Sequence, residues 1–276
     1  MNFDMNTCWS RAVELVQDNF SLLSAVAAVF FLLPTMALYL LIPDMQTLAD
    51  PSTNPEVMAA RMTEILLPLM GIVVATMVVQ FVGYATMVAL MSDERPTVGQ
   101  ALAAGVKVLP GMLVILLLFG LVYIIGAMLI MVPITLLAGV AGAPALGLIG
   151  VFPVLLFVVW LMARMSMSMP VMVLGGRINP LGAISASFAM TKPKQWPILL
   201  FWFVIFVVMT IIGVLVSGVS GLIAALVGTG TASMVVLGIT NGAWGMLSGM
   251  IVSALAVAMY AQLSGPSASA IEETFD

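Results

Sequence analysis

Six stretches of this 276-residue chain are each long and apolar enough to cross a membrane. A membrane helix needs about 20 mostly apolar residues, and the stretches run over about 20–42, 65–91, 108–138, 144–172, 196–227 and 234–263. Apolar residues make up 63% of the chain and charged residues 7%, against about 45–50% and about 25% in soluble domains. The sequence therefore predicts an all-α, polytopic membrane protein with six transmembrane helices.

The chain lacks the residue types that most catalytic and metal sites need. It has no histidine and one cysteine, Cys8, which excludes histidine bases, Cys–His nucleophiles, cysteine-cluster metal sites and an intrachain disulfide. No Asp or Glu lies near the centre of a predicted span, where ion-coupled transporters usually need one. The net charge of −4 disfavours nucleic acid as a partner, since phosphate binding needs a basic face. We therefore expect a protein that is not an enzyme and holds no cofactor and no metal.

The basic residues predict the orientation of the chain in the membrane. With six spans both termini lie on one side, and seven of the eight Lys and Arg residues fall on that side. Only Arg61, in the loop predicted over 43–63, lies on the other. Because positive charge marks cytoplasmic loops, both termini are predicted to be cytoplasmic. The first 19 residues do not match a signal peptide.

A short amphipathic segment precedes each odd-numbered span. These segments lie at about 7–20, 97–109 and 180–191, and Asn179-Pro180 is a strong helix start. We interpret the chain as one membrane domain over 1–263 with three repeats of interfacial helix, span, turn and span, at about 6–91, 96–172 and 179–263. The alternative is that such segments flank the spans by chance. Residues 264–276 are predicted to be a flexible cytoplasmic tail.

The stretch from Arg164 to Trp196 carries a distinctive pattern. It resembles the membrane domain of bacterial glycerophosphoryl diester phosphodiesterases and related stand-alone six-span inner-membrane proteins of unknown function. The matching residues are, in order, Arg164, Pro170, Gly175, Pro180, Ser187, Phe188, Thr191, Lys192 and Trp196. Methionines replace the usual aliphatic residues, and the paired arginines of the family's interfacial helix are missing.

The resemblance implies a membrane architecture and a place in the bacterial inner (cytoplasmic) membrane. It does not imply phosphodiesterase activity, because in that family the activity belongs to a separate domain built on His, Glu and a metal. The resemblance brings no established catalytic or binding residue to this chain.

Polar side chains near the spans provide two sets of candidates. The candidates for contact with lipid headgroups are Arg164, Arg177, Lys192, Lys194 and Trp196. Arg164 either snorkels to the headgroups or contacts a phosphate or carboxylate from inside the bundle. The alternative for the basic segment is a topology signal with an aromatic belt. Within the spans, Gln80, Tyr84 and Asn241 either line a polar path or, as we favour, form interhelical hydrogen bonds.

Two further patterns concern packing. Met165, Met167 and Met169 alternate with serines, and thioethers bind Cu(I), but residues two apart on a helix do not face each other, so we favour packing. Small residues recur at helical spacing in spans five and six: Gly213, Ser217, Gly221, Gly238, Gly242, Gly245 and Gly249. They predict that these two spans pack closely as a hairpin, with homodimerisation as the alternative.

Two functional hypotheses follow from the sequence. The first is a non-enzymatic integral membrane protein that organises or supports a membrane assembly or its lipid environment. The alternative is a carrier or binding site for a lipid or other amphiphile, near Arg164, Lys192 and Trp196. The expected partners are membrane lipids, together with a membrane protein partner or a second copy of the chain.

Overall fold

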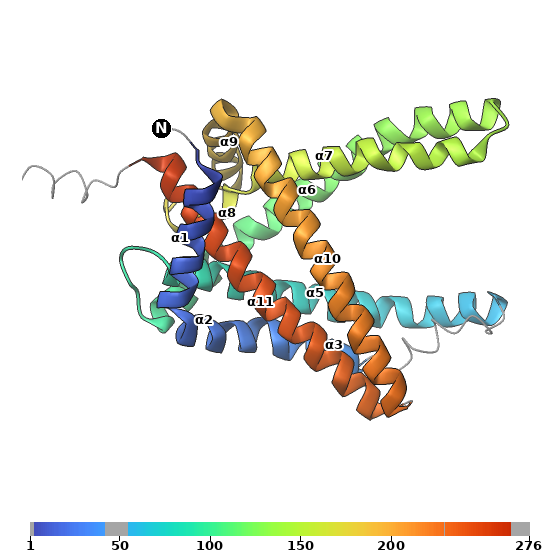
Figure 1. The fold of residues 1–276 in the computed structure, drawn as a ribbon, viewed down its shortest axis with the longest axis horizontal. Helices are drawn as coiled ribbons and strands as arrows, with labels where there is room; N and C mark the ends of the chain where they lie inside the picture. The colour runs from blue at the N-terminus through green and yellow to red at the C-terminus, as the bar shows by residue number, and fades with distance from the viewer. Residues whose placement is uncertain (1–2, 42–54, 229, 266–276) are drawn as a thin grey trace, which may run out of the picture. The chain divides into compact units, whose positions relative to one another are not determined.

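The computed structural model describes residues 3–41, 55–228 and 230–265, without the side chains of 55–68, 144 and 146. The described chain is helical apart from short turns, and it contains no strand (Figure 1). Six of its helical segments are long and apolar enough to span a membrane: Phe20–Leu41, Leu69–Leu90, Val98–Val140, Gly147–Val173, Pro180–Val227 and Thr231–Ser264. The prediction of an all-α protein with six membrane helices is confirmed, and the chain is a multi-pass membrane protein.

Two of the three predicted amphipathic segments form separate helices. They are α1 (Met5–Asp18) and α9 (Pro180–Thr191). The helix α1 ends at Asn19, which has φ −114° and ψ 14°. Helix α9 starts where Pro180 takes the first helical position, and the Asn179 side-chain oxygen accepts hydrogen bonds from the backbone N–H groups of Leu181 and Gly182, at 3.1 and 3.4 Å. Asn19 separates α1 from the first span, and the turn at Lys192–Lys194 separates α9 from the helix that begins at Gln195.

The third amphipathic segment differs from the prediction. Residues 98–109 do not form a separate helix, because α6 (Val98–Val140) continues through them and into the third span. Helix α6 starts with a capping box. The Gln100 side-chain oxygen accepts from the Thr97 backbone N–H at 2.9 Å, and the Gln100 backbone N–H donates to the Thr97 hydroxyl at 3.4 Å. No comparable stop follows in 101–109, which are mostly helix-forming Ala, Leu and Val. Pro110 is accommodated inside the helix.

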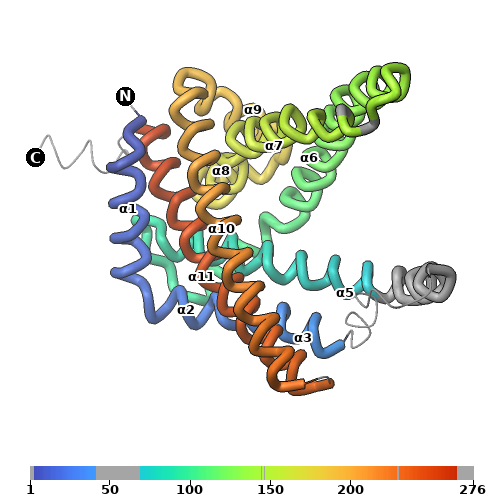
Figure 2. Tube along the Cα trace, turned by 45° about the vertical axis from the view of Figure 1, so that its right-hand side comes forward, coloured from blue at the N-terminus to red at the C-terminus, as the bar shows by residue number. Residues whose placement is uncertain are grey.

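The described chain divides into two compact units, and Figure 2 traces the path of the chain through its helices. Unit 1 comprises the described parts of Met1–Ala12, Lys107–Val208 and Leu255–Asp276. Unit 2 comprises the described parts of Val13–Val106 and Met209–Ala254. Helices α1, α6, α10 (Gln195–Val227) and α11 (Thr231–Ser264) contribute residues to both units. The predicted division into three repeats stays a prediction.

Unit 2 is built around the first span, whose helix is not uniform. It consists of α2 (Phe20–Ala27), a π-helical turn η1 (Ala28–Leu32) and α3 (Leu33–Leu41). The Leu33 N–H bonds to the Ala28 carbonyl five residues back, and Pro34 follows without a donor. A proline clashes with the carbonyl four residues before it, so the wide turn accommodates Pro34 without ending the helix.

Glycines bring the backbone of the first span close to α11. A Cβ atom at Gly238 would lie 3.1 Å from Met36 Cα, and one at Gly242 would lie 3.0 Å from the Leu32 carbonyl oxygen. One at Gly249 would lie 2.9 Å from the Phe31 ring. Gly245 is looser, with Thr35 Oγ1 at 3.9 Å from the same built position. Small residues at these positions allow two helix axes to approach.

This contact corrects one part of the packing prediction. The atoms nearest to Cβ positions built at Gly238, Gly242, Gly245 and Gly249 belong to the first span. The fifth span contacts α11 elsewhere: Gly213 lies against Trp244, and Ser217 donates to the Asn241 side-chain oxygen at 3.1 Å. No atom lies within 4 Å of a Cβ built at Gly221. The glycine spacing predicts a close helix contact but does not identify the partner helix, which explains the error.

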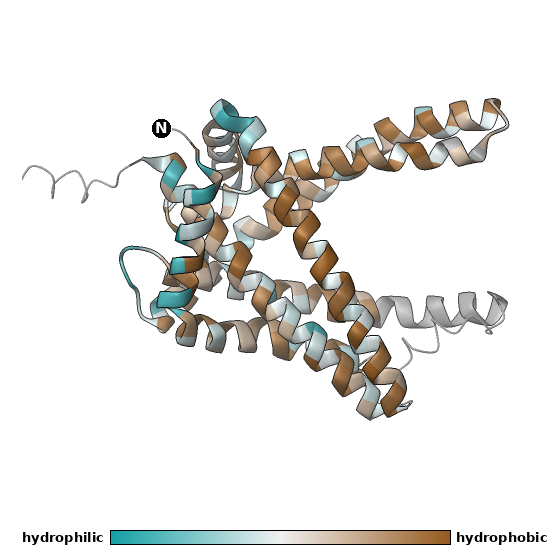
Figure 3. Cartoon of the chain, viewed as in Figure 1, coloured by the Kyte–Doolittle hydropathy of each residue, from teal (hydrophilic) through white to brown (hydrophobic). Residues whose placement is uncertain are grey.

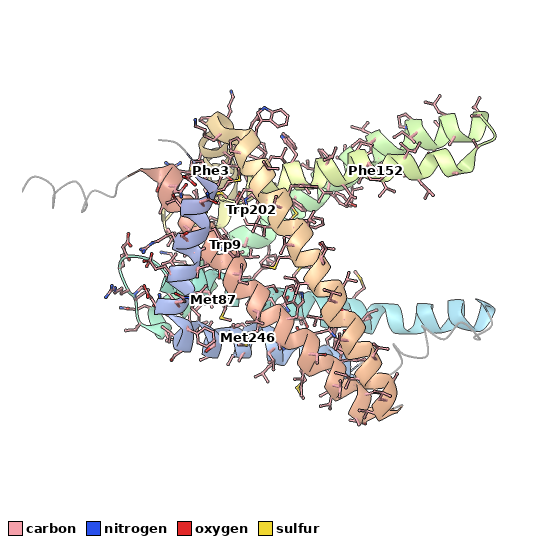
Figure 4. All side chains as sticks on the ribbon, in the orientation of Figure 1. Phe3, Trp9, Met87, Phe152, Trp202 and Met246 are labelled. Carbon is pink, nitrogen blue, oxygen red and sulfur yellow. The ribbon has the colours of Figure 1, made fainter. Side chains whose placement is uncertain are left out.

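Unit 1 contains the hairpin formed by the third and fourth spans. Helix α6 leads through a turn at Ala141–Ala143, where Gly142 has φ +63°, to η2 (Pro144–Gly150) and α7 (Val151–Met165). Gly126 lies against the Phe157 ring, and Gly150 lies against Met131 and Ile134. The outer surface of this hairpin is apolar along its length, and Phe152 points outward from it (Figures 3 and 4). Such a surface suits lipid contact.

The structure describes two of the predicted segments only in part. Of the loop predicted over 43–63, residues 42–54 lie outside the described residues, and from Pro55 onward the chain is already helix α5 (Pro55–Leu90). The predicted tail lies outside the described residues from 266 onward, and α11 ends at Ser264.

Candidate functional site

The most unusual arrangement of polar groups lies in unit 1, at a break in the fourth span. Helix α7 ends at Met165 and α8 (Ser168–Val173) begins three residues later. Pro170 explains the break, since its ring clashes with the carbonyl four residues back, that of Ser166. A break in a membrane helix leaves backbone groups that must find partners inside the protein.

Ser187, on α9, supplies those partners. Its hydroxyl donates to the Arg164 carbonyl oxygen at 2.6 Å and accepts from the Met167 backbone N–H at 3.2 Å. Ser187 is fully buried. One side chain therefore ties α9 to both sides of the break and fixes the backbone at Arg164.

The Arg164 side chain turns into the protein. Only 8% of the residue is exposed. Its Nη1 donates to the Thr191 hydroxyl at 2.9 Å, and its Cζ lies 4.5 Å from the centre of the Phe188 ring. Trp160 meets Phe188 edge to face, at 6.4 Å between ring centres. Of the two predicted possibilities, snorkelling outward and contact inside the bundle, the structure has the inward orientation.

The guanidinium has fewer partners than its chemistry demands. It carries five N–H donors, but its single hydrogen bond among the described residues is the one to Thr191. The Nε atom is fully enclosed and has no partner in the described part of the chain. Leaving a charged donor buried and unpaired costs more than the about 1–3 kcal/mol of a neutral group. An arrangement this costly calls for a compensating group.

No carboxylate among the described residues of unit 1 supplies that compensation. Residues 107–208 carry five basic residues and no Asp or Glu. Asp4 is the acidic residue of unit 1 among those described. Its Oδ1 accepts from the backbone N–H groups of Asn6 and Thr7, at 2.8 and 3.1 Å, and so caps the start of α1. Within the described part of its unit, the buried positive charge of Arg164 is thus matched by an aromatic face and a hydroxyl, but by no anion.

Two other buried donors of unit 1 lack partners among the residues that the structure describes. They are the Ser168 hydroxyl and the Trp202 indole Nε1. Figure 4 places Trp202 on the first part of α10. Ser187, Thr191, Ser168 and Trp202 were not singled out as binding residues by the sequence. The available signal was the helical spacing of Ser187 and Thr191, four residues apart on a short helix.

The other predicted headgroup contacts lie at the surface of unit 1. Arg177 and Lys192 are exposed, Lys194 is half-buried, and Trp196 is 72% exposed. Lys192 and Lys194 belong to the turn η3 (Lys192–Lys194), which follows α9. The structure therefore does not gather the predicted set into one site: Arg164 is internal and the others are peripheral.

The three polar residues predicted within the spans lie in unit 2, and each has a protein partner. Gln80 donates to the Thr35 hydroxyl at 3.5 Å, and the Tyr84 hydroxyl donates to the Val252 carbonyl at 3.4 Å. Asn241 donates to the Leu237 carbonyl at 2.9 Å and to the Ser220 hydroxyl at 3.4 Å. The bond of Asn241 to Leu237 lies within α11, and the bonds to Thr35, Val252 and Ser220 join helices of unit 2, as intramembrane polar residues commonly do.

The methionines near Arg164 are largely enclosed in the protein, and their role in packing stays a prediction. Met167 is fully buried, Met169 is 8% exposed, and Met165 is half-buried. Among the described residues there is no group of three or more His, Cys, Asp or Glu side chains that could hold a metal.

No family model, curated protein or solved structure matches this chain. The function must therefore be argued from the site itself.

Proposed function

We propose that this chain is a non-enzymatic, multi-pass protein of the bacterial inner membrane, with both termini cytoplasmic, that binds an anionic lipid or other anionic amphiphile at Arg164. One observation carries the proposal: Arg164, a residue that is 8% exposed, has an enclosed, unpaired Nε and no carboxylate partner among the described residues of its unit. Buried arginines in membrane spans mark functional sites by default. An anionic headgroup supplies the charge that these residues do not.

The surroundings of Arg164 support an amphiphile as the ligand. The Phe188 and Trp160 rings adjoin the guanidinium, and the outer surface of the α6–α7 hairpin in the same unit is apolar. An acyl chain matches such a surface, whereas a small hydrophilic anion gains nothing from it. The inner-membrane location and the cytoplasmic termini rest on the family resemblance and on the distribution of Lys and Arg.

The proposal favours the binding hypothesis over the assembly hypothesis. The assembly hypothesis rests on scarce soluble loops and on small-residue packing, and the described glycines of α11 serve contacts within the chain. A partner protein nonetheless remains one outcome of the test.

The test is native mass spectrometry of the full-length chain, extracted gently from its own membrane. We expect one anionic amphiphile to stay bound to the unmodified chain and to be lost from Arg164→Ala. Arg177→Ala is the matched control, because it removes an exposed arginine of the same unit. A bound amphiphile that survives Arg164→Ala, or a bound protein with no stoichiometric amphiphile, contradicts the proposal.

A further inference from the structure

The two edges of the Arg164 guanidinium differ in their partners. On one side, Nη1 is paired with the Thr191 hydroxyl at 2.9 Å. The opposite edge consists of Nε and Nη2, and neither atom has a hydrogen bond among the described residues. These two N–H groups form the side-on fork of arginine, which matches two oxygen atoms of a phosphate or carboxylate.

Thr191 pairs with Nη1, so that the unpaired donor Nε lies on the fork edge of the guanidinium. Its hydroxyl donates to the Ser187 carbonyl at 2.8 Å, so the lone pairs of its oxygen are left to accept from Nη1. Phe188 covers one face of the guanidinium. Since Thr191 and Phe188 both lie on α9, one helix fixes the orientation of the charged group by an edge contact and a face contact.

The unpaired donors and the basic residues of unit 1 bear on whether the anionic group is a carboxylate or a phosphate. Besides Nε, the Ser168 hydroxyl and the Trp202 indole Nε1 are buried without partners in the described chain, and both belong to the same unit. A carboxylate and a phosphate ester can each offer two oxygens to the fork, and each oxygen keeps a lone pair for another donor. A phosphate monoester adds a third unesterified oxygen and more negative charge. The five basic and no acidic residues of 107–208 favour the more highly charged group as well.

We infer that the anionic group of the ligand is a phosphate ester, which Arg164 holds through Nε and Nη2; this inference rests on the proposed function. Thr191 is the positioning residue that leaves this edge of the guanidinium to the phosphate. The phosphate belongs to a membrane lipid headgroup or to a free phosphate. An inorganic phosphate arm in the experiment separates these two sources.

The experiment uses the full-length chain in a non-ionic detergent without phosphate. Dioctanoyl phosphatidylglycerol, laurate and inorganic phosphate are titrated separately, and binding is measured by native mass spectrometry. The Nε–H signals of the five arginines are followed in parallel by nuclear magnetic resonance. We expect phosphatidylglycerol to bind at least about tenfold more tightly than laurate, and to shift the one Nε–H signal that is missing in Arg164→Lys.

The variants separate the fork from charge alone. Arg164→Lys keeps the charge but loses the planar fork, so we expect phosphatidylglycerol binding to fall about tenfold or more. Thr191→Val removes the hydroxyl and frees Nη1, and an effect of about tenfold is expected there too. Thr191→Ser restores the hydroxyl and returns affinity to within about threefold. Lys192→Ala, which removes the exposed neighbouring charge, controls for surface electrostatics.

The outcomes distinguish this inference from the proposed function. If no probe binds, or if Arg164→Ala binds as the unmodified chain does, both are wrong. If Arg164→Ala loses binding but laurate binds as tightly as phosphatidylglycerol, or Arg164→Lys binds normally, the amphiphile site stands and the phosphate fork is wrong. An unchanged Nε–H signal and affinity in Thr191→Val overturns the role of Thr191. Equal binding of inorganic phosphate assigns the site to free phosphate and contradicts a lipid ligand.

Discussion

Units 1 and 2 treat their buried polar groups in different ways. In unit 2 the buried hydroxyls of Thr86 and Ser253 donate to backbone carbonyls of their own helices, at 2.7 and 2.8 Å. In unit 1 a charged group, a hydroxyl and an indole N–H are enclosed without enough partners, and these are the unpaired buried side-chain atoms of the described chain. Buried polar groups are normally satisfied, so unit 1 departs from the usual pattern and unit 2 follows it; the proposed ligand of unit 1 would account for the difference.

The close contacts of unit 2 support its structural role. Its spans meet where glycines allow it, at Gly83 against Phe30 and at Gly242 against Leu32. Packing of this kind stabilises helices in lipid, where no hydrophobic driving force brings them together. In unit 1, by contrast, the Phe188 ring and the Thr191 hydroxyl contact the charged Arg164 guanidinium. The predictions below test this contrast, beginning with the largest expected effect.

The largest effect is expected from filling the contact between α5 and the π-helical turn. Gly83→Leu places a side chain where Phe30 Cβ already lies, and overpacking costs about 1–3 kcal/mol or more. We expect a loss of at least about 3 kcal/mol in the free energy of unfolding, measured by denaturant titration in mild detergent.

Gly71→Leu is the matched control, because it makes the same change in the same helix with no atom within 4 Å of the added Cβ. It is expected to be neutral or slightly stabilising, since glycine costs about 1 kcal/mol within a helix. Equal effects of the two substitutions would show that packing at Gly83 contributes nothing special to unit 2.

The second prediction concerns the stabilisation that a ligand gives to unit 1. A ligand at 100 times its dissociation constant stabilises the folded protein by about 2.7 kcal/mol. We expect phosphatidylglycerol to raise the midpoint of thermal unfolding of the unmodified chain, and to leave that of Arg164→Met unchanged. Without ligand, Arg164→Met is expected to change the free energy of unfolding by less than about 1 kcal/mol, because it removes an unpaired buried charge together with its partial compensation.

Arg177→Met controls for the loss of a positive charge, since Arg177 is exposed. It should keep the ligand-induced shift. A large loss of stability in ligand-free Arg164→Met would instead make Arg164 a structural residue like those of unit 2, and the contrast between the units would disappear.

The sequence predicted the features that depend on local chemistry. The six spans follow from apolar length, and α9 begins at Asn179-Pro180 because the cap and the proline act within one turn. The continuous helix through 98–109 could not be predicted from its amphipathic pattern, since a stripe of apolar residues does not specify where a helix stops. A stop needs its own residues, such as the Lys192–Lys194 turn after α9.

Features that depend on contacts distant in sequence could not be predicted. The glycine spacing of α11 indicated a close neighbour, but only the fold shows that this neighbour is the first span. Arg164 was a candidate from its place in a span, yet its partner Thr191 lies 27 residues further along the chain. The choice between an outward and an inward arginine depends on that partner, which no local pattern contains.

A third, smaller effect is expected at the polar contact of α10 and α11 in unit 2. Asn241→Leu removes bonds to the Leu237 carbonyl and to two serines, Ser217 and Ser220. Intramembrane hydrogen bonds average about 0.6 kcal/mol each, so we expect a loss of about 1 kcal/mol in the free energy of unfolding. Gln80→Leu, which removes a single bond of 3.5 Å, should cost less. A reversed order would contradict the assignment of Asn241 as the stronger structural contact.

The smallest effect on stability, and the most direct test of how unit 1 is closed, concerns Cys8. Cys8 is fully buried, and its Sγ lies 4.0 Å from the Leu255 carbonyl oxygen. Burial raises the pKa of the thiol to about 12, and the thiolate is the reactive form. Below pH 9 the thiol is therefore neutral in the folded chain. As pH rises from about 9 to about 12, ionisation favours the unfolded chain, and the stability that this residue contributes is lost.

At pH 8 we expect maleimide to modify Cys8 at least about a hundredfold more slowly in the folded chain than after denaturation, because both exposure and thiolate are lacking. Ser10→Cys in a Cys8→Ala background places a thiol at an exposed position of the same helix, and it should react at the rate of the denatured chain. Rapid modification of Cys8 in the folded chain would mean that α1 does not stay packed on α11. Unit 1 would then lack the α1–α11 contact at Cys8 and Leu255, whereas the glycine contacts of unit 2 would be unaffected.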